Sequence, residues 1–284
     1  MNRQLSTTNH DRDIAGLKYI YPVMSRRAGG LSIGVNLNTN NACNWRCIYC
    51  QVPDLRRGSA PVMDFALLEE ELRFFLDQVR RGDFFEKFNV VPEQRVIKDI
   101  AISGNGEPTS LKEFARAVGL IGEIATETGV FPASHFVLIT NGSLLHQADV
   151  QEGLKTLAHF GGEVWFKLDS ATVEGRKLIN NSALGQRQLM ENLAAAARLC
   201  PTKLQTCMLH FRERAWSASE KHAYLKFLQD TRKQRIDIRK IMLYSLARQS
   251  HQPEATELEP ITIEEMEAFA ADIEAFGFDV GVNP

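Results

Sequence analysis

The sequence has no apolar run long enough to cross a bilayer and no strong net charge. Its longest apolar stretches, such as 136–139 and 164–168, fall far short of the about 20 residues that a membrane helix needs. The formal net charge is -2 at pH 7, so the molecule has no overall field that would draw it onto nucleic acid. The first 13 residues are polar and lack the apolar stretch of a secretory signal, which predicts a cytoplasmic protein.

Linkers rich in proline, glycine and serine are also absent, as are internal repeats and low-complexity tracts. A hydrophobic fraction of 44% and a charged fraction of 24% exclude disordered and fibrous classes and predict one globular domain. We expect an N-terminal extension over residues 1–30 and a core with a C-terminal helix over 31–284.

Runs rich in Val, Ile and Phe alternate with segments of helical period, which predicts repeated βα units around a parallel sheet. Strands are expected over 31–37, 96–103, 135–140, 163–168, 204–210 and 238–244. Helices are expected over 64–81, 111–127, 144–160, 173–199, 217–231 and 263–276. Ser110 with Glu113, and Thr262 with Glu265, have the spacing of capping boxes. Periodicity allows either an open doubly wound sheet or a curved, incomplete barrel, and in both the ligands bind at the carboxyl ends of the strands.

Three of the five cysteines stand close together, whereas Cys200 and Cys207 lie far along the chain. Cys43, Cys47 and Cys50 form a C-x-x-x-C-x-x-C run directly after the first predicted strand. Three thiolates on a short loop can hold three irons of a [4Fe-4S] cluster and leave the fourth iron open for a small molecule. A structural zinc site is the alternative, but it needs a fourth ligand, which Cys207 or a histidine would have to supply.

With this motif the chain resembles the radical S-adenosylmethionine (SAM) superfamily, in which an aromatic residue precedes the third cysteine. Tyr49 occupies that place, and the resemblance implies that it packs by the adenine of SAM. It also implies a glycine-containing turn after the second strand, near the methionine amino group, and Gly104, Asn105, Gly106 and Glu107 form such a segment. We therefore expect an α/β fold, a single-domain partial (β/α)6 barrel of parallel strands with outer helices.

Polar residues follow the third and fourth predicted strands, whose ends converge in a parallel barrel. Asn141, Asp169 and Ser170 are expected to bond the ribose hydroxyls or the methionine carboxylate of SAM. Lys167 is expected to pair with that carboxylate. Turn formation and helix capping explain the same residue types without a ligand.

A closer resemblance is to the Fe-S oxidoreductase branch that includes wyosine-type tRNA-modifying enzymes. It rests on the cysteine loop and on the segments 21–27, which ends in Arg26 and Arg27, 104–109 and 244–248. The residues before the double arginine depart from the pattern of that branch, so the resemblance does not name the substrate.

The resemblance implies an enzyme that reductively cleaves SAM at a [4Fe-4S] cluster and generates a 5'-deoxyadenosyl radical, which acts on an unidentified substrate. The implied partner is a low-potential electron donor such as a flavodoxin or ferredoxin. The alternatives are an enzyme that modifies tRNA or another RNA, a non-catalytic metal-binding module, and an activase that installs a radical on a partner protein. RNA contact would use the basic runs at 56–57, 80–81 and 232–235, although such runs are also common on solvated faces.

Overall fold

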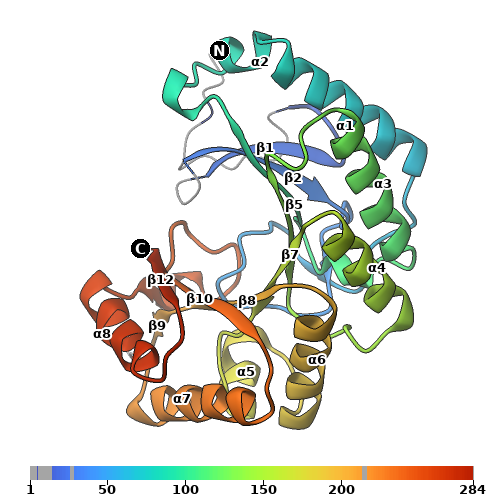
Figure 1. Cartoon of the computed structure of the whole chain (residues 1–284). Helices are drawn as coiled ribbons and strands as arrows, with labels where there is room; N and C mark the ends of the chain where they lie inside the picture. Colours follow the sequence, from blue (N-terminus) through green and yellow to red (C-terminus); the bar gives the residue numbers. More distant parts are fainter. Residues whose placement is uncertain (1–4, 6–14, 26–28, 213–215, 284) are drawn as a thin grey trace.

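The computed structural model describes residues 5, 15–25, 29–212 and 216–283 of the chain. Its centre is one curved sheet of eight strands, and helices lie along the outside of the curve (Figure 1). The order across the sheet is β1-β2-β5-β6-β7-β8-β10-β12. The strands are β1 Ile20–Ser25, β2 Gly30–Asn36, β5 Ile97–Ser103, β6 His135–Thr140, β7 Glu163–Lys167, β8 Thr202–Cys207, β10 Ile238–Tyr244 and β12 Val280–Asn283.

From β2 to β12 every neighbouring pair of strands is parallel, and each strand is added beside the one before it in the chain. A doubly wound sheet reverses its direction of growth at a switch point, and this sheet does not. The predicted partial barrel of parallel strands is therefore confirmed. All six predicted strands are present, and the run 204–210 is divided at Met208 into β8 and the short β9, Leu209–Phe211.

Two strands at the edges of the sheet were not predicted. β1 is antiparallel to β2, with Ile20 opposite Val35, and it contains Pro22. A proline lacks the N–H that a central strand needs, but an edge strand tolerates it. β12 has only four residues and pairs with β10 on one side. The division of the chain at residue 30 stays a prediction, while β1 joins the same sheet as the rest. Arg26 and Arg27 lie outside the described residues.

The helices are α1 Phe65–Arg80, α2 Asp83–Lys87, α3 Phe114–Glu127, α4 Ala148–His159, α5 Val173–Asn180, α6 Gln186–Leu199, α7 Ala218–Lys233 and α8 Ile263–Glu274. The single helix predicted over 173–199 is wrong, because the chain breaks between α5 and α6. Asn181 ends α5 in the left-handed conformation, at φ 49°. None of the helices in the described part of the chain combines the length and apolarity of a membrane span.

The outer helices cover the sheet through apolar stripes. On α3, Phe114, Val118 and Ile121 recur at helical spacing and are fully buried. They belong to the same core cluster as Phe136 and Leu138 of β6. Burial of one such side chain contributes about 1.5–3 kcal/mol, so this layer of contacts fixes the strands whose ends carry the site.

One of the two predicted capping boxes is present. Thr262 and Glu265 bond each other's backbone N–H groups at the start of α8. The box predicted for Ser110 and Glu113 is wrong, because α3 begins later and its N-cap residue, Glu113, makes no side-chain capping bond. The Ser110 hydroxyl is engaged elsewhere, since it donates to the Glu107 carbonyl at 2.7 Å.

Candidate functional site

A cavity of about 680 Å³ lies inside the curved sheet, and the loop that carries the cysteines forms part of its wall. Cys43, Cys47 and Cys50 all line it. Trp165 and Gln205, which stand deeper along β7 and β8, line it as well. The volume is in the range of cofactor and ligand pockets. The fold therefore brings three thiols of one short loop to a space that can hold a small molecule.

Short-range bonds shape the cysteine loop. The Cys50 N–H donates to the Cys47 carbonyl at 3.0 Å, and the Trp45 N–H donates to Cys43 Sγ at 3.4 Å. Burial raises the pKa of the Cys43 thiol and of the Cys47 thiol to about 12 each. Both thiols are therefore protonated at neutral pH, and they become thiolates when a metal displaces their protons.

The spread of these thiols bears on the kind of metal group that they fit. Among the described residues, no three Cys, His, Asp or Glu side chains stand close enough together to hold one metal ion. Zinc needs its sulfur ligands at about 2.3 Å from a single centre. In a cubane cluster each thiolate binds a different iron, so the ligands stand further apart. Three thiols around one cavity are a donor set that a cubane cluster can use, with one thiolate on each of three irons.

The glycine turn after β5 packs tightly against the cysteine loop. Gly104 has φ 140°, and a Cβ there would lie 2.4 Å from the Asn36 side-chain oxygen. A Cβ on Gly106 would lie 2.0 Å from the Ala42 carbonyl oxygen. Only glycine fits either place, and both glycines line the cavity. Asn105 does not line it, since its side chain donates to Asn41 at 2.6 Å.

Glu107 and Asn141 join the ends of β5 and β6. The buried Glu107 carboxylate accepts from the Thr140 hydroxyl at 2.6 Å and from the Asn141 N–H at 2.7 Å. Burial raises the pKa of Glu107, although these hydrogen bonds oppose the shift. The Asn141 amide in turn donates to the Asn44 side chain at 2.8 Å. Both residues line the cavity, and both brace the cysteine loop against the strand ends.

Lys167 is a cation in the cavity wall. Its Nζ donates to the Tyr244 hydroxyl at 3.0 Å and lies 4.8 Å from the centre of the Tyr49 ring. Burial by itself lowers the pKa of Lys167. Asp169 and the hydrogen bond to Tyr244 act in the opposite direction, and the net effect holds the pKa of Lys167 well above its ordinary value. The group therefore stays an ammonium at neutral pH and can pair with an anionic ligand.

The remaining predicted residues split between the cavity and its supports. Tyr49 lines the cavity, and its hydroxyl donates to Asp169 at 2.5 Å. Asp169 is buried behind it and also accepts from the Cys207 N–H at 2.9 Å. Ser170 is fully buried and donates to Glu220 of α7 at 2.7 Å. Neither Asp169 nor Ser170 lines the cavity, and a direct contact of either with SAM stays a prediction.

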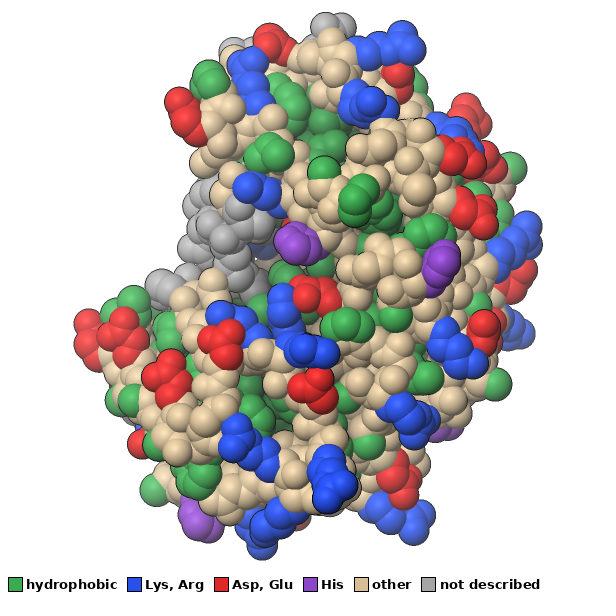
Figure 2. Space-filling view, in the orientation of Figure 1, with side chains coloured by type: hydrophobic (Ala, Val, Ile, Leu, Met, Phe, Trp, Pro, Cys, Tyr) green, Lys and Arg blue, Asp and Glu red, His purple; other side chains and the backbone are tan. Residues whose placement is uncertain are grey.

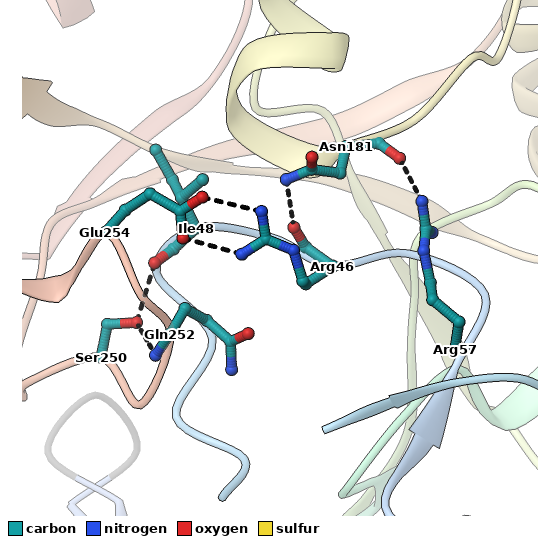
Figure 3. A network of polar contacts seen from close by, with 7 residues as sticks. All are labelled: Arg46, Ile48, Arg57, Asn181, Ser250, Gln252 and Glu254. Carbon is teal, nitrogen blue, oxygen red and sulfur yellow. Dashed lines mark hydrogen bonds and ion pairs between the residues drawn. The ribbon is translucent and has the colours of Figure 1, made fainter. Parts of the chain in front are cut away.

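Two segments distant in sequence hold the cysteine loop from outside (Figure 3). Arg46 makes a two-bond ion pair with Glu254, each bond 2.7 Å long. The Asn181 amide donates to the Arg46 carbonyl at 2.8 Å. Ser250 donates to the Ile48 carbonyl at 2.8 Å. The loop is thus fixed between the α5–α6 turn and the segment 248–254.

Sequence reasoning missed these supports. Asn180, Asn181 and Ser182 are turn-forming residues inside a helical pattern, and they were a signal for the break between α5 and α6. No local signal pointed to Glu254, because its partner Arg46 stands 208 residues earlier in the chain.

Solved structures share this fold at low sequence identity. A structure of TYW1 with a lysine-pyruvate adduct bound is 17% identical, with a TM-score of 0.56 over 86% of this chain and 73% of that one. A radical SAM methyltransferase from Sphaerobacter thermophilus is 13% identical, with a TM-score of 0.58 over 92% of this chain and 68% of that one. SuiB from Streptococcus suis, bound to S-adenosylmethionine, is 9% identical, with a TM-score of 0.56 over 91% of this chain and 52% of that one.

A curated relative, the GTPase Obg of Brachyspira hyodysenteriae, is 27% identical over 133 residues. This chain spans 17% of the length of that protein, and the match covers 47% of this chain. The family model of the radical SAM superfamily matches residues 37–215, which include the cysteine loop and the strand ends around the cavity. Since that match covers more than half of the chain, the protein belongs to the radical SAM superfamily.

Proposed function

We propose that this protein holds one [4Fe-4S] cluster on Cys43, Cys47 and Cys50 and reductively cleaves SAM in the adjoining cavity. The observation that carries the proposal is that three thiols of one loop line the same cavity as the glycine turn and the Lys167 ammonium. With one electron from a low-potential donor, the bound cluster and SAM supply methionine and a 5'-deoxyadenosyl radical, which takes hydrogen from a substrate.

The chain's own residues account for binding and orientation. Gly104 and Gly106 let the backbone of the turn approach the ligand closely. The Lys167 ammonium would pair with the methionine carboxylate. Tyr49 would offer its ring to the adenine, and its hydroxyl bond to Asp169 keeps the ring in place. The curved sheet limits the access of water to the reacting carbon.

The substrate stays open within this proposal. The basic runs are engaged within the chain: Arg57 donates to the Asn181 carbonyl, Arg81 pairs with Asp77, and Lys233 pairs with Asp230. On the face in Figure 2, Lys and Arg side chains alternate with Asp and Glu side chains. That face offers no continuous basic track for a phosphate backbone.

The test is anaerobic iron-sulfur reconstitution, followed by reduction with dithionite in the presence of SAM and assay for 5'-deoxyadenosine. The parent is compared with a Cys43→Ala, Cys47→Ala, Cys50→Ala variant. Cys200→Ala is the matched control, because this thiol is buried away from the cavity and donates to the Gly162 carbonyl. We expect product from the parent and from the control, and none from the triple variant. A parent that takes up only zinc under these conditions would contradict the proposal.

A further inference from the structure

Asn180 reaches one of the three cysteines with its side chain. It is the last residue of α5 and is 1% exposed. Its amide nitrogen lies 3.3 Å from Cys47 Sγ and 2.7 Å from Asp169 Oδ2. The nitrogen carries two hydrogens, so one points to the carboxylate and the other to the sulfur. The Trp45 backbone N–H makes a contact of this kind with Cys43.

The orientation of this amide follows from its neighbours. Asp169 already accepts from the Tyr49 hydroxyl and from the Cys207 N–H, which is the pattern of an ionised carboxylate. A reversed Asn180 amide would place its oxygen against that carboxylate and against the sulfur. In the observed orientation the Asn180 oxygen is buried without a hydrogen-bond partner. A buried oxygen without a partner destabilises the fold. The stability of the fold therefore does not explain why an asparagine stands at this position.

The docking of α5 on the cysteine loop does not depend on this side chain. The Ile48 N–H donates to the Ile179 carbonyl at 2.8 Å, and the Arg46 N–H donates to the Asn180 carbonyl at 3.2 Å. These are backbone bonds that any residue at position 180 preserves. The side chain of Asn180 therefore has a contribution of its own, directed at the sulfur.

We propose that Asn180 tunes the reduction potential of the cluster by donating an N–H···S hydrogen bond to the Cys47 thiolate, with Asp169 holding the amide in place. The inference rests on the proposed function. Reduction adds negative charge to a cluster and its thiolates, and a donor to a sulfur stabilises that charge. Asn180 is buried and Cys47 is half-buried, so their interaction is partly shielded from water. Asn180 therefore raises the potential and eases electron entry from a weak reductant.

The experiment titrates the reduced cluster by electron paramagnetic resonance in the reconstituted parent and in Asn180→Leu, which keeps the branching of the side chain and removes both donors. We expect about a tenfold lower ratio of reduced to oxidised cluster at a fixed ambient potential, which is about 59 mV for one electron. Asn181→Gly is the matched control, since it removes a side-chain donor to the same loop but leaves the sulfur contact and suits φ 49°. Its potential should equal that of the parent.

A second measurement needs no variant. With asparagine labelled with 15N in its side-chain amide, the reduced parent should show a 15N hyperfine coupling to the cluster. A parent that binds no iron refutes the proposed function. A parent that binds the cluster but lacks the coupling, or an Asn180→Leu variant with an unchanged potential, refutes only the role of Asn180.

Discussion

Lys167 illustrates how the site is built at the scale of single residues. β7 delivers it to the cavity, Tyr244 fixes its Nζ, and Tyr49 provides an aromatic face at 4.8 Å. Held between two aromatic rings, the ammonium loses little conformational freedom when an anion arrives. An ammonium is thereby placed in a wall that also carries the acidic side chains of Glu107 and Asp99.

We predict that Lys167→Met raises the dissociation constant for SAM at least about tenfold, which is about 1.4 kcal/mol. The reason is that the carboxylate of the ligand would be buried without its counter-charge. Equilibrium dialysis of reconstituted protein with labelled SAM measures the effect. Lys203→Met is the control, because Lys203 pairs with Glu163 at 2.7 Å and does not line the cavity. Equal affinities in the two variants would exclude Lys167 from the SAM site.

The residues that could be predicted are those whose signal is local. Cys43, Cys47 and Cys50 stand out by their spacing, and the glycine turn after the second predicted strand was expected from the family resemblance. The sequence predicted that Asp169 follows β7. It did not predict which way the Asp169 side chain points, because a strand pattern fixes side-chain direction only within the strand. Asn180 was not predicted, because its partner Cys47 lies 133 residues away in the chain.

Among the elements, the six central strands were predictable, since most contain a short run of buried apolar residues, as in β5 and β6. The edges were not, because Pro22 and the short β12 weaken the pattern there. The break between α5 and α6 has the largest functional consequence, since it turns Asn180 and Asn181 toward the cysteine loop. A continuous helix could not have made these contacts.

The segment 248–254 is the second support of the loop, and its charge makes the support dependent on pH. Hydrogen bonding from Arg46 lowers the pKa of Glu254 below its ordinary value. The ionised carboxylate therefore stabilises the fold at any pH above the pKa of Glu254 in the unfolded chain. This stabilisation is lost as the pH falls through the lower pKa of Glu254 in the folded protein. We predict that Glu254→Gln reduces the free energy of unfolding of the metal-free protein by about 1–2 kcal/mol at pH 7, and by progressively less in acid.

Urea unfolding followed by circular dichroism from pH 7 to pH 3 measures this difference. Glu259→Gln is the control, because this substitution removes the same charge. Glu259 is exposed on β11 (Leu258–Pro260). A difference between parent and Glu254→Gln that stays constant across this range would show that the ion pair is not the cause.

At the scale of the whole molecule, the sheet curves around a cavity that the cysteine loop helps to enclose. In the proposed function, SAM would contact both a bound cluster and the strand ends. Its binding would therefore stabilise the folded protein. We predict that SAM at 100 times its dissociation constant stabilises the reconstituted protein by about 2.7 kcal/mol and raises its Tm by about 4–5 °C.

Differential scanning fluorimetry under anaerobic conditions tests this. We expect a much smaller shift in Tm for the metal-free protein and for the variant with all three loop cysteines replaced. In both, SAM can contact protein residues but no iron. Shifts of equal size with and without iron would mean that SAM binds without using the cluster.

The support of the loop by residues far along the chain sets an order of events during synthesis. Cys43, Cys47 and Cys50 leave the ribosome early, whereas Ser250 and Glu254, which bond the same loop, emerge more than 190 residues later. Until these residues emerge, the nascent chain presents three thiols on a loop without these partners. The loop can acquire its final shape only after residues 250–254 have been made, so a cluster that needs the preformed loop would be inserted after that point.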